Sequence, residues 1–129
     1  MRRVVVTGLG IVSSIGNTAQ EVTAALKAGK SGIVASDEMV EHGFRSQIAG
    51  TLKYDVSEHI DKRTLRFMGP GAAYAYIAMS QAIADAGLTE EMISNPRTGL
   101  IAGSGGPSTS AMKTAHDTVD RTGATKRIG

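Results

Sequence analysis

The hydrophobic positions of this 129-residue chain fall into strand-like and helical runs that glycines separate. Residues 4–7 (VVVT) are β-branched and bounded by glycine, which predicts a strand buried on both faces. Residues 97–102 (RTGLIA) predict a second buried strand. Between them the apolar spacing becomes helical. Strands followed by helices predict an α/β fold.

The helix expected at 70–86 has an unusual composition. Alanine occupies seven of its positions, and only Ser80, Gln81 and Asp85 are plainly polar. A helix that is apolar nearly all round is buried nearly all round. A single domain of this length seldom surrounds such a helix, so we expect it to lie between layers of something larger.

Shorter elements are predicted from caps and spacing. Asn17 is expected to cap an amphipathic helix that ends near Lys27, with Gly29 just beyond it. Short helices are expected at 37–43, 60–68 and 89–94, an edge strand within 45–52, and a polar helix at 110–120. The tail 121–129 carries no capping or core signal.

Composition narrows the function classes. The apolar fraction of 41% is that of a globular protein, and 14 basic against 12 acidic residues give little support for nucleic-acid binding. Cysteine is absent, so these residues hold no disulfide, thiolate metal site or cysteine nucleophile. No apolar run is long enough for a membrane span, and we expect a cytoplasmic protein.

Gly8-x-Gly10 after a strand suggests a dinucleotide-binding turn. The third glycine of that fingerprint is replaced by Ser13, and the helix begins too late. A tight turn at a strand end is the favoured interpretation.

Other candidate groups lack a catalytic pattern. The histidines are scattered and are expected on the surface, and the serines lack a Gly-x-Ser-x-Gly elbow. Gly103–Gly106 follows a predicted strand, where a pocket wall and a plain turn both stay open. These groups are His42, His59 and His116, and Ser13, Ser14 and Ser104.

Basic residues cluster at Lys62, Arg63 and Arg66, with Lys126 as a possible addition. Composition favours a solvated charged face over a docking patch for an acidic partner.

Several stretches taken together resemble the amino terminus of β-ketoacyl-acyl-carrier-protein synthases, the condensing enzymes of fatty acid synthesis. They are RRVVVTGLGIVSSIGN, KSGI, DKRTLRFM, QAIADAGL and NPRTGLIAGSGG. The resemblance implies a thiolase-like five-layer α-β-α-β-α fold, with the helix at 70–86 in the central layer. It also implies decarboxylative condensation of an acyl chain with malonyl-carrier protein, in a cytoplasmic homodimer without metal or nucleotide cofactor.

Residue by residue, the resemblance carries over binding positions only. Lys62, Arg63 and Arg66 match the basic patch that meets acyl carrier protein, and Lys126 is a weaker match to its second part. Gly105 and Gly106 match glycines of the acyl pocket, whereas Pro107 departs from the pattern.

The resemblance places the nucleophilic cysteine and two histidines beyond Gly129. We therefore expect 1–129 to be an incomplete amino-terminal domain, inactive and poorly folded by itself. The alternatives are a non-catalytic domain that binds carrier protein and, more weakly supported, a dinucleotide-binding domain.

Overall fold

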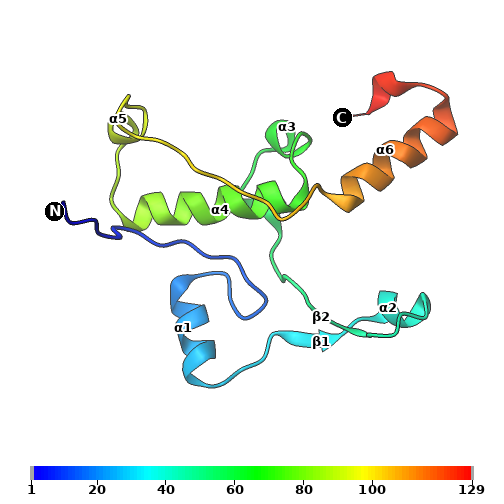
Figure 1. Ribbon diagram of the computed structural model, residues 1–129, viewed down its shortest axis with the longest axis horizontal. Helices are drawn as coiled ribbons and strands as arrows, with labels where there is room; N and C mark the ends of the chain where they lie inside the picture. The colour runs from blue at the N-terminus through cyan, green and yellow to red at the C-terminus, as the bar shows by residue number, and fades with distance from the viewer. Residues whose placement is uncertain (1, 129) are drawn as a thin grey trace. The chain divides into compact units, whose positions relative to one another are not determined.

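The computed structural model describes residues 2–128, as a set of helices with one small sheet among these residues (Figure 1). The elements in chain order are α1 (Ala19–Lys27), β1 (Ile33–Ala35), α2 (Asp37–Glu41), β2 (Ile48–Gly50), η1 (Val56–Glu58), α3 (Lys62–Leu65), α4 (Pro70–Asp85), α5 (Glu90–Ile93), α6 (Thr109–Thr122) and η2 (Thr125–Arg127). They divide into two units: residues 2–55 with 77–87, and residues 56–76 with 88–128.

The two predicted buried strands are wrong for this structure. Residues 4–7 and 97–102 have no strand conformation, and Val4 and Ile101 are 94% and 97% exposed. A strand is completed by backbone hydrogen bonds to a neighbouring strand. None of residues 2–128 supplies such a neighbour to either stretch.

In the first unit, the amino-terminal segment lies against α4 at two glycines. A Cβ added to Gly8 would come within 2.2 Å of the Ala82 carbonyl oxygen, and one added to Gly10 within 1.8 Å of the Ala78 carbonyl oxygen. Real Cβ atoms do not approach backbone this closely, so both positions require glycine. The small alanines of α4 form the other side of this contact.

Polar side chains of α4 hold the same segment by its backbone. The Leu9 amide donates to the Asp85 carboxylate at 2.9 Å, and the Ile11 amide donates to Gln81 Oε1 at 2.9 Å. Gln81 Nε2 donates in turn to the Asn17 carbonyl at 2.8 Å. These helix side chains thus satisfy backbone groups that would otherwise need a neighbouring strand.

Helix α1 begins one residue later than predicted. Thr18, not Asn17, is the N-cap, and its hydroxyl accepts from the Glu21 amide. The Glu21 carboxylate accepts from the Asn17 amide at 2.7 Å, so cap and first turn support each other. Gly29 follows the helix with a φ of +61°, as predicted.

The sheet of the first unit is an antiparallel pair, β1 and β2, with Val34 opposite Ala49. The strand expected within 45–52 is confirmed as β2, whereas β1 was not predicted. A Cβ on Gly32 would lie 2.5 Å from Ser14 Oγ, so the turn at 13–16 packs tightly against the start of β1.

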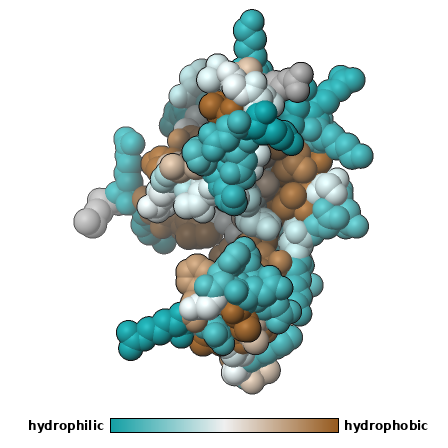
Figure 2. Space-filling model, turned by 90° about the vertical axis from the view of Figure 1, so that its right-hand side faces the viewer, coloured by the Kyte–Doolittle hydropathy of each residue, from teal (hydrophilic) through white to brown (hydrophobic). Residues whose placement is uncertain are grey.

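The long helix is confirmed as α4, but its expected burial is wrong. Only Ala73 and Ile77 are buried along it, and Tyr76 and Met79 are 48% and 43% exposed. Apolar residues reach the surface among polar ones (Figure 2). Residues 2–128 therefore leave much of this apolar helix uncovered.

In the second unit the predicted short helices form where their caps lie. Thr89 caps α5, and Ser108 caps α6 through the Ala111 amide. The expected polar helix at 110–120 is confirmed. The tail was expected to lack a capping signal, which is wrong because Gly123 ends α6 with a φ of +62°.

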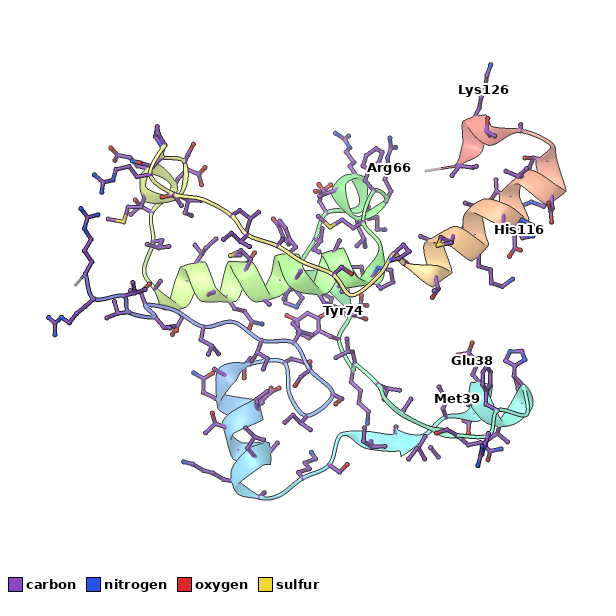
Figure 3. All side chains as sticks on the ribbon, in the orientation of Figure 1. Glu38, Met39, Arg66, Tyr74, His116 and Lys126 are labelled. Atoms are coloured by element: carbon purple, nitrogen blue, oxygen red, sulfur yellow. The ribbon has the colours of Figure 1, made fainter. Side chains whose placement is uncertain are left out.

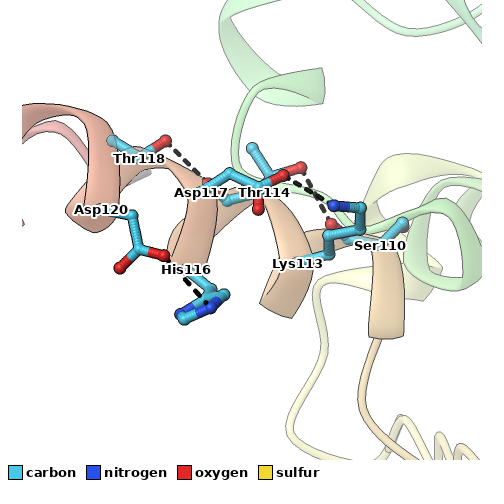
Figure 4. Close-up of polar contacts among 7 residues, drawn as sticks. All are labelled: Ser110, Lys113, Thr114, His116, Asp117, Thr118 and Asp120. Carbon is cyan, nitrogen blue, oxygen red and sulfur yellow. Dashed lines mark hydrogen bonds and ion pairs between the residues drawn. The ribbon is translucent and has the colours of Figure 1, made fainter.

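Helix α6 is stabilised along its own surface, as Figure 4 shows. Lys113 pairs with Asp117 at 2.9 Å, and His116 lies 3.3 Å from Asp120. The hydroxyls of Thr114 and Thr118 donate to carbonyls one turn back. These i,i+4 contacts suit an exposed helix.

We predict that Gly10→Ala destabilises the protein, because its methyl group would enter the space of the Ala78 carbonyl. Overpacking of this kind costs about 1–3 kcal/mol. Urea unfolding followed by circular dichroism measures the change. The matched control is Gly71→Ala in α4, where an added Cβ meets nothing within 4 Å. Equal stability of the two variants would contradict the packing argument.

Candidate functional site

The second unit presents a basic surface at α3, defined here as Lys62, Arg63 and Arg66. All three side chains are exposed, and none forms an ion pair with the part of the chain that the structure describes. A short helix with three unpaired cations attracts anionic groups.

Asp61 determines where α3 begins. Its carboxylate accepts from the amides of Arg63 at 2.8 Å and Thr64 at 3.2 Å, and from the Thr64 hydroxyl. These donors, the Thr64 hydroxyl first, lower the pKa of Asp61 below 3.8. The N-cap is therefore anionic at neutral pH and orients the first turn that carries the cations.

Arg66 follows the last helical residue of α3, and its guanidinium lies over the ring of Phe67, 4.4 Å from the centroid. Figure 3 shows Arg66 at the end of α3 and Lys126 on η2. Both residues belong to the second unit, and Lys126 is exposed.

A cavity of about 320 Å³ lies between residues 66–70, which follow α3, and helix α6. Arg66 lines this cavity together with Thr114, Thr118 and Ile128. Lys126 lies two residues before Ile128 but does not itself line this cavity, and of the basic surface only Arg66 does.

The glycine loop 103–107 borders a larger cavity, of about 880 Å³. Its other walls are the first turns of α4 and α6, including Ala72 and Ala75. Gly106 lines the cavity, whereas Gly105 does not. The Ser104 hydroxyl donates to the Gly106 carbonyl at 2.7 Å and fixes the turn. The loop therefore lines a cavity and also forms a turn, so both interpretations stay open.

The remaining candidates are not assembled into a catalytic group. His42 lies edge-on to Phe44, and His116 pairs with Asp120 on α6. Within residues 2–128 no three metal-ligating side chains gather. The Ser104 hydroxyl contacts a backbone carbonyl and not a histidine.

The dinucleotide interpretation of Gly8 and Gly10 is wrong in this structure. A Cβ added to either glycine would lie within 2.2 Å of the α4 backbone, so the glycines serve helix packing and leave no space for a pyrophosphate there.

None of the helices within residues 2–128 has the length and apolar character that a membrane span requires.

Two local features of this surface, the Asp61 cap and the contact of Arg66 with Phe67, were not predicted from the sequence. The Asp61-x-x-Thr64 spacing was a readable cap signal, because Asp is a preferred N-cap. The stacking of Arg66 on Phe67 had no such signal, since adjacent residues within a helix do not face each other.

Comparison with known proteins connects these features. The family described as "Beta-ketoacyl synthase, N-terminal domain" matches residues 1–128. The chain is 55% identical over all 129 residues to 3-oxoacyl-[acyl-carrier-protein] synthase 1 of Haemophilus influenzae, and covers 32% of that relative. It is 55% identical over 109 residues, 84% of the chain, to the synthase 1 of Escherichia coli K12, covering 27% of it. The chain thus spans about a third of the length of the curated relatives.

Solved structures agree with the sequence relatives. A beta-ketoacyl synthase from Burkholderia phymatum superposes over 100% of the chain and 32% of its own, with a TM-score of 0.78 and 31% identity. The ishigamide ketosynthase/chain length factor matches 97% of the chain and 31% of its own, with a TM-score of 0.80 and 28% identity. The predicted α/β class and thiolase-like fold are confirmed.

We predict that the pKa of the Asp61 carboxyl lies below 3.8. An NMR pH titration measures it, and the amide signals of Arg63 and Thr64, which donate to this carboxylate, should shift with the same midpoint. Because the folded pKa is lowered, the cap stabilises α3 above pH 3.8 and is lost as the pH falls through the folded value. Thr64→Val removes the hydroxyl donor and should move the pKa back toward 3.8. Titration of Asp61 at or above 3.8 in the unmodified protein would contradict this assignment.

Proposed function

This chain belongs to the beta-ketoacyl synthase family, and we propose that it serves as the amino-terminal portion of a 3-oxoacyl-[acyl-carrier-protein] synthase. Such an enzyme is an acyltransferase of fatty acid biosynthesis that condenses an acyl chain with malonyl-carrier protein. The observation that carries the proposal is the 55% identity to synthase 1 over the whole chain.

In the proposed reaction a cysteine thiolate takes the acyl group from its carrier. Malonyl-carrier protein then loses CO₂, and the resulting carbanion attacks the acyl thioester and releases the thiolate. The 129 residues contain no cysteine. None of their three histidines lies in a motif of the catalytic pair. We therefore assign this chain to binding and not to bond making, and we expect it to be inactive alone.

The carrier protein is the proposed partner of the basic surface. Its three cations are exposed and unpaired among the described residues, which supports attraction of an acidic protein. Lys126 extends this surface in the proposal, since it is an exposed cation of the same unit and matches the family's second basic position. The family resemblance further implies a cytoplasmic homodimer that needs no metal or nucleotide.

The glycine-lined cavity is the proposed place for part of the acyl chain. Gly106, Ala72, Ala75 and Pro107 form a small and apolar part of its walls, and the hydroxyl residues Ser104, Ser108, Thr109 and Ser110 line another part. A flexible hydrocarbon is held by apolar walls of this kind. Gly105 is retained in the proposal as a neighbour that shapes the loop.

A second candidate function is a non-catalytic domain that binds carrier protein, which the exposed cations of the basic surface favour. The two differ in one assay of the protein encoded by the complete gene. Release of CO₂ from malonyl-carrier protein with formation of a 3-oxoacyl product supports the synthase. Carrier binding without either product supports the binding domain.

We predict that reversal of the basic surface, Lys62→Glu with Arg63→Glu and Arg66→Glu, weakens carrier-protein binding by about tenfold or more. Attraction becomes repulsion, and the loss should shrink as salt screens the charges. Titration calorimetry of the complete protein at two salt concentrations measures both effects. The control is the same charge change in the first unit: Lys27→Glu with Lys30→Glu and Lys53→Glu. Equal binding by the two triple variants would contradict the assignment.

We predict that Gly106→Met reduces kcat/KM for long acyl chains by about tenfold or more, while short chains are still used, because a side chain there fills the cavity. Gly106→Ala should be mild, since an added Cβ meets no atom within 4 Å. Gly99→Met is the control, because Gly99 does not line the cavity and an added Cβ there meets no atom within 4 Å. A chain-length profile identical in both Met variants would rule out this role for Gly106.

A further inference from the structure

Phe67 is an exposed aromatic residue inside the basic surface. Its side chain is 69% exposed, although the preceding apolar residue Leu65 and the following Met68 are both partly buried. The Arg66 guanidinium lies 4.4 Å from its ring centroid. One face of the ring is thus occupied by a cation of the basic surface.

The backbone explains why these adjacent residues can stack. Helix α3 ends at Leu65, and Arg66 caps it. The Phe67 amide donates to the Thr64 carbonyl at 3.1 Å, and the Met68 amide to the Leu65 carbonyl at 3.0 Å. These turn contacts tie the ring to the last turn of α3. The position of the guanidinium is then tied to the same helix through the ring.

Contact with the ring gives Arg66 less side-chain freedom than Lys62 and Arg63 have. An exposed Arg or Lys side chain loses rotamer freedom when it binds a carboxylate. The guanidinium of Arg66 is already restrained by the ring, and its edge donors remain available for a bidentate carboxylate contact. Lys62 and Arg63 make no aromatic contact within residues 2–128. Arg66 is therefore the preorganised cation of the three.

We propose that Phe67 is a positioning residue for carrier-protein docking, which holds the Arg66 guanidinium over its ring so that the N–H donors of the guanidinium meet a carboxylate of the acidic partner. This inference rests on the proposed function and deepens it. The recognised group is a carboxylate on an acidic protein, and the specificity lies in the orientation of one guanidinium and not in total charge.

The test is a double-mutant cycle in the complete protein, with the dissociation constant for acyl carrier protein as the measurement. An exposed cation–π contact corresponds to about a two- to fivefold change in affinity. Phe67→Leu should weaken binding by that factor, and Phe67→Tyr, which keeps an aromatic face, should restore it. In an Arg66→Gln background, Phe67→Leu should have no further effect.

The matched control places Phe67→Leu in an Arg63→Gln background, where its full two- to fivefold effect should persist. A Phe67→Leu effect that is absent with Arg66 intact, or that is equal in the Arg66→Gln background, would overturn the inference. In both cases reversal of the basic surface would still weaken binding, so the proposed function would stand. Failure of the unmodified protein to bind carrier protein would overturn the proposed function and this inference together.

Discussion

The contact between the amino-terminal segment and α4 is the constraint on which the first unit depends. Two glycines let the segment approach the helix backbone, and two helix side chains, Gln81 and Asp85, bind its amides. Gln81 also reaches the Asn17 carbonyl, next to the cap of α1. One helix face thereby positions the segment, the following turn and the start of α1. Gln81 and Asp85 are two of the three plainly polar residues of α4.

Helix α4 also shows that apolar composition alone does not bury a helix. Its alanines and tyrosines are apolar nearly all round, yet only Ala73 and Ile77 are buried. Hydrophobic stabilisation is proportional to the apolar area removed from water, so an uncovered helix gains little of it. The valines at 4–6 and the pair Leu100 and Ile101 are exposed for the same reason. These surfaces are suited to cover by further protein, as in the larger thiolase-like fold of this family.

The candidate site combines local and distant determinants. The cations of α3 stand beside one another because a single cap, Asp61, starts a short helix. The glycine loop becomes a cavity wall only because the first turns of α4 and α6 stand opposite it. Sequence likeness predicts that both are binding elements, but it did not separate Gly106 from Gly105. Nor did it show that Arg66 stacks on Phe67.

Helices, caps and C-terminal glycines could be predicted from the order of residues, because their hydrogen bonds join groups a few positions apart. Gly29 and the helix expected at 89–94 illustrate this, and the one-residue error at Asn17 reflects two neighbouring residues that can both cap. The α/β family was likewise readable from the sequence. Tertiary structure decided three features: whether 4–7 forms a strand, how much of α4 is buried, and that Gly8 and Gly10 pack against a helix. Each depends on atoms far along the chain, and no local pattern specifies whether those atoms are there.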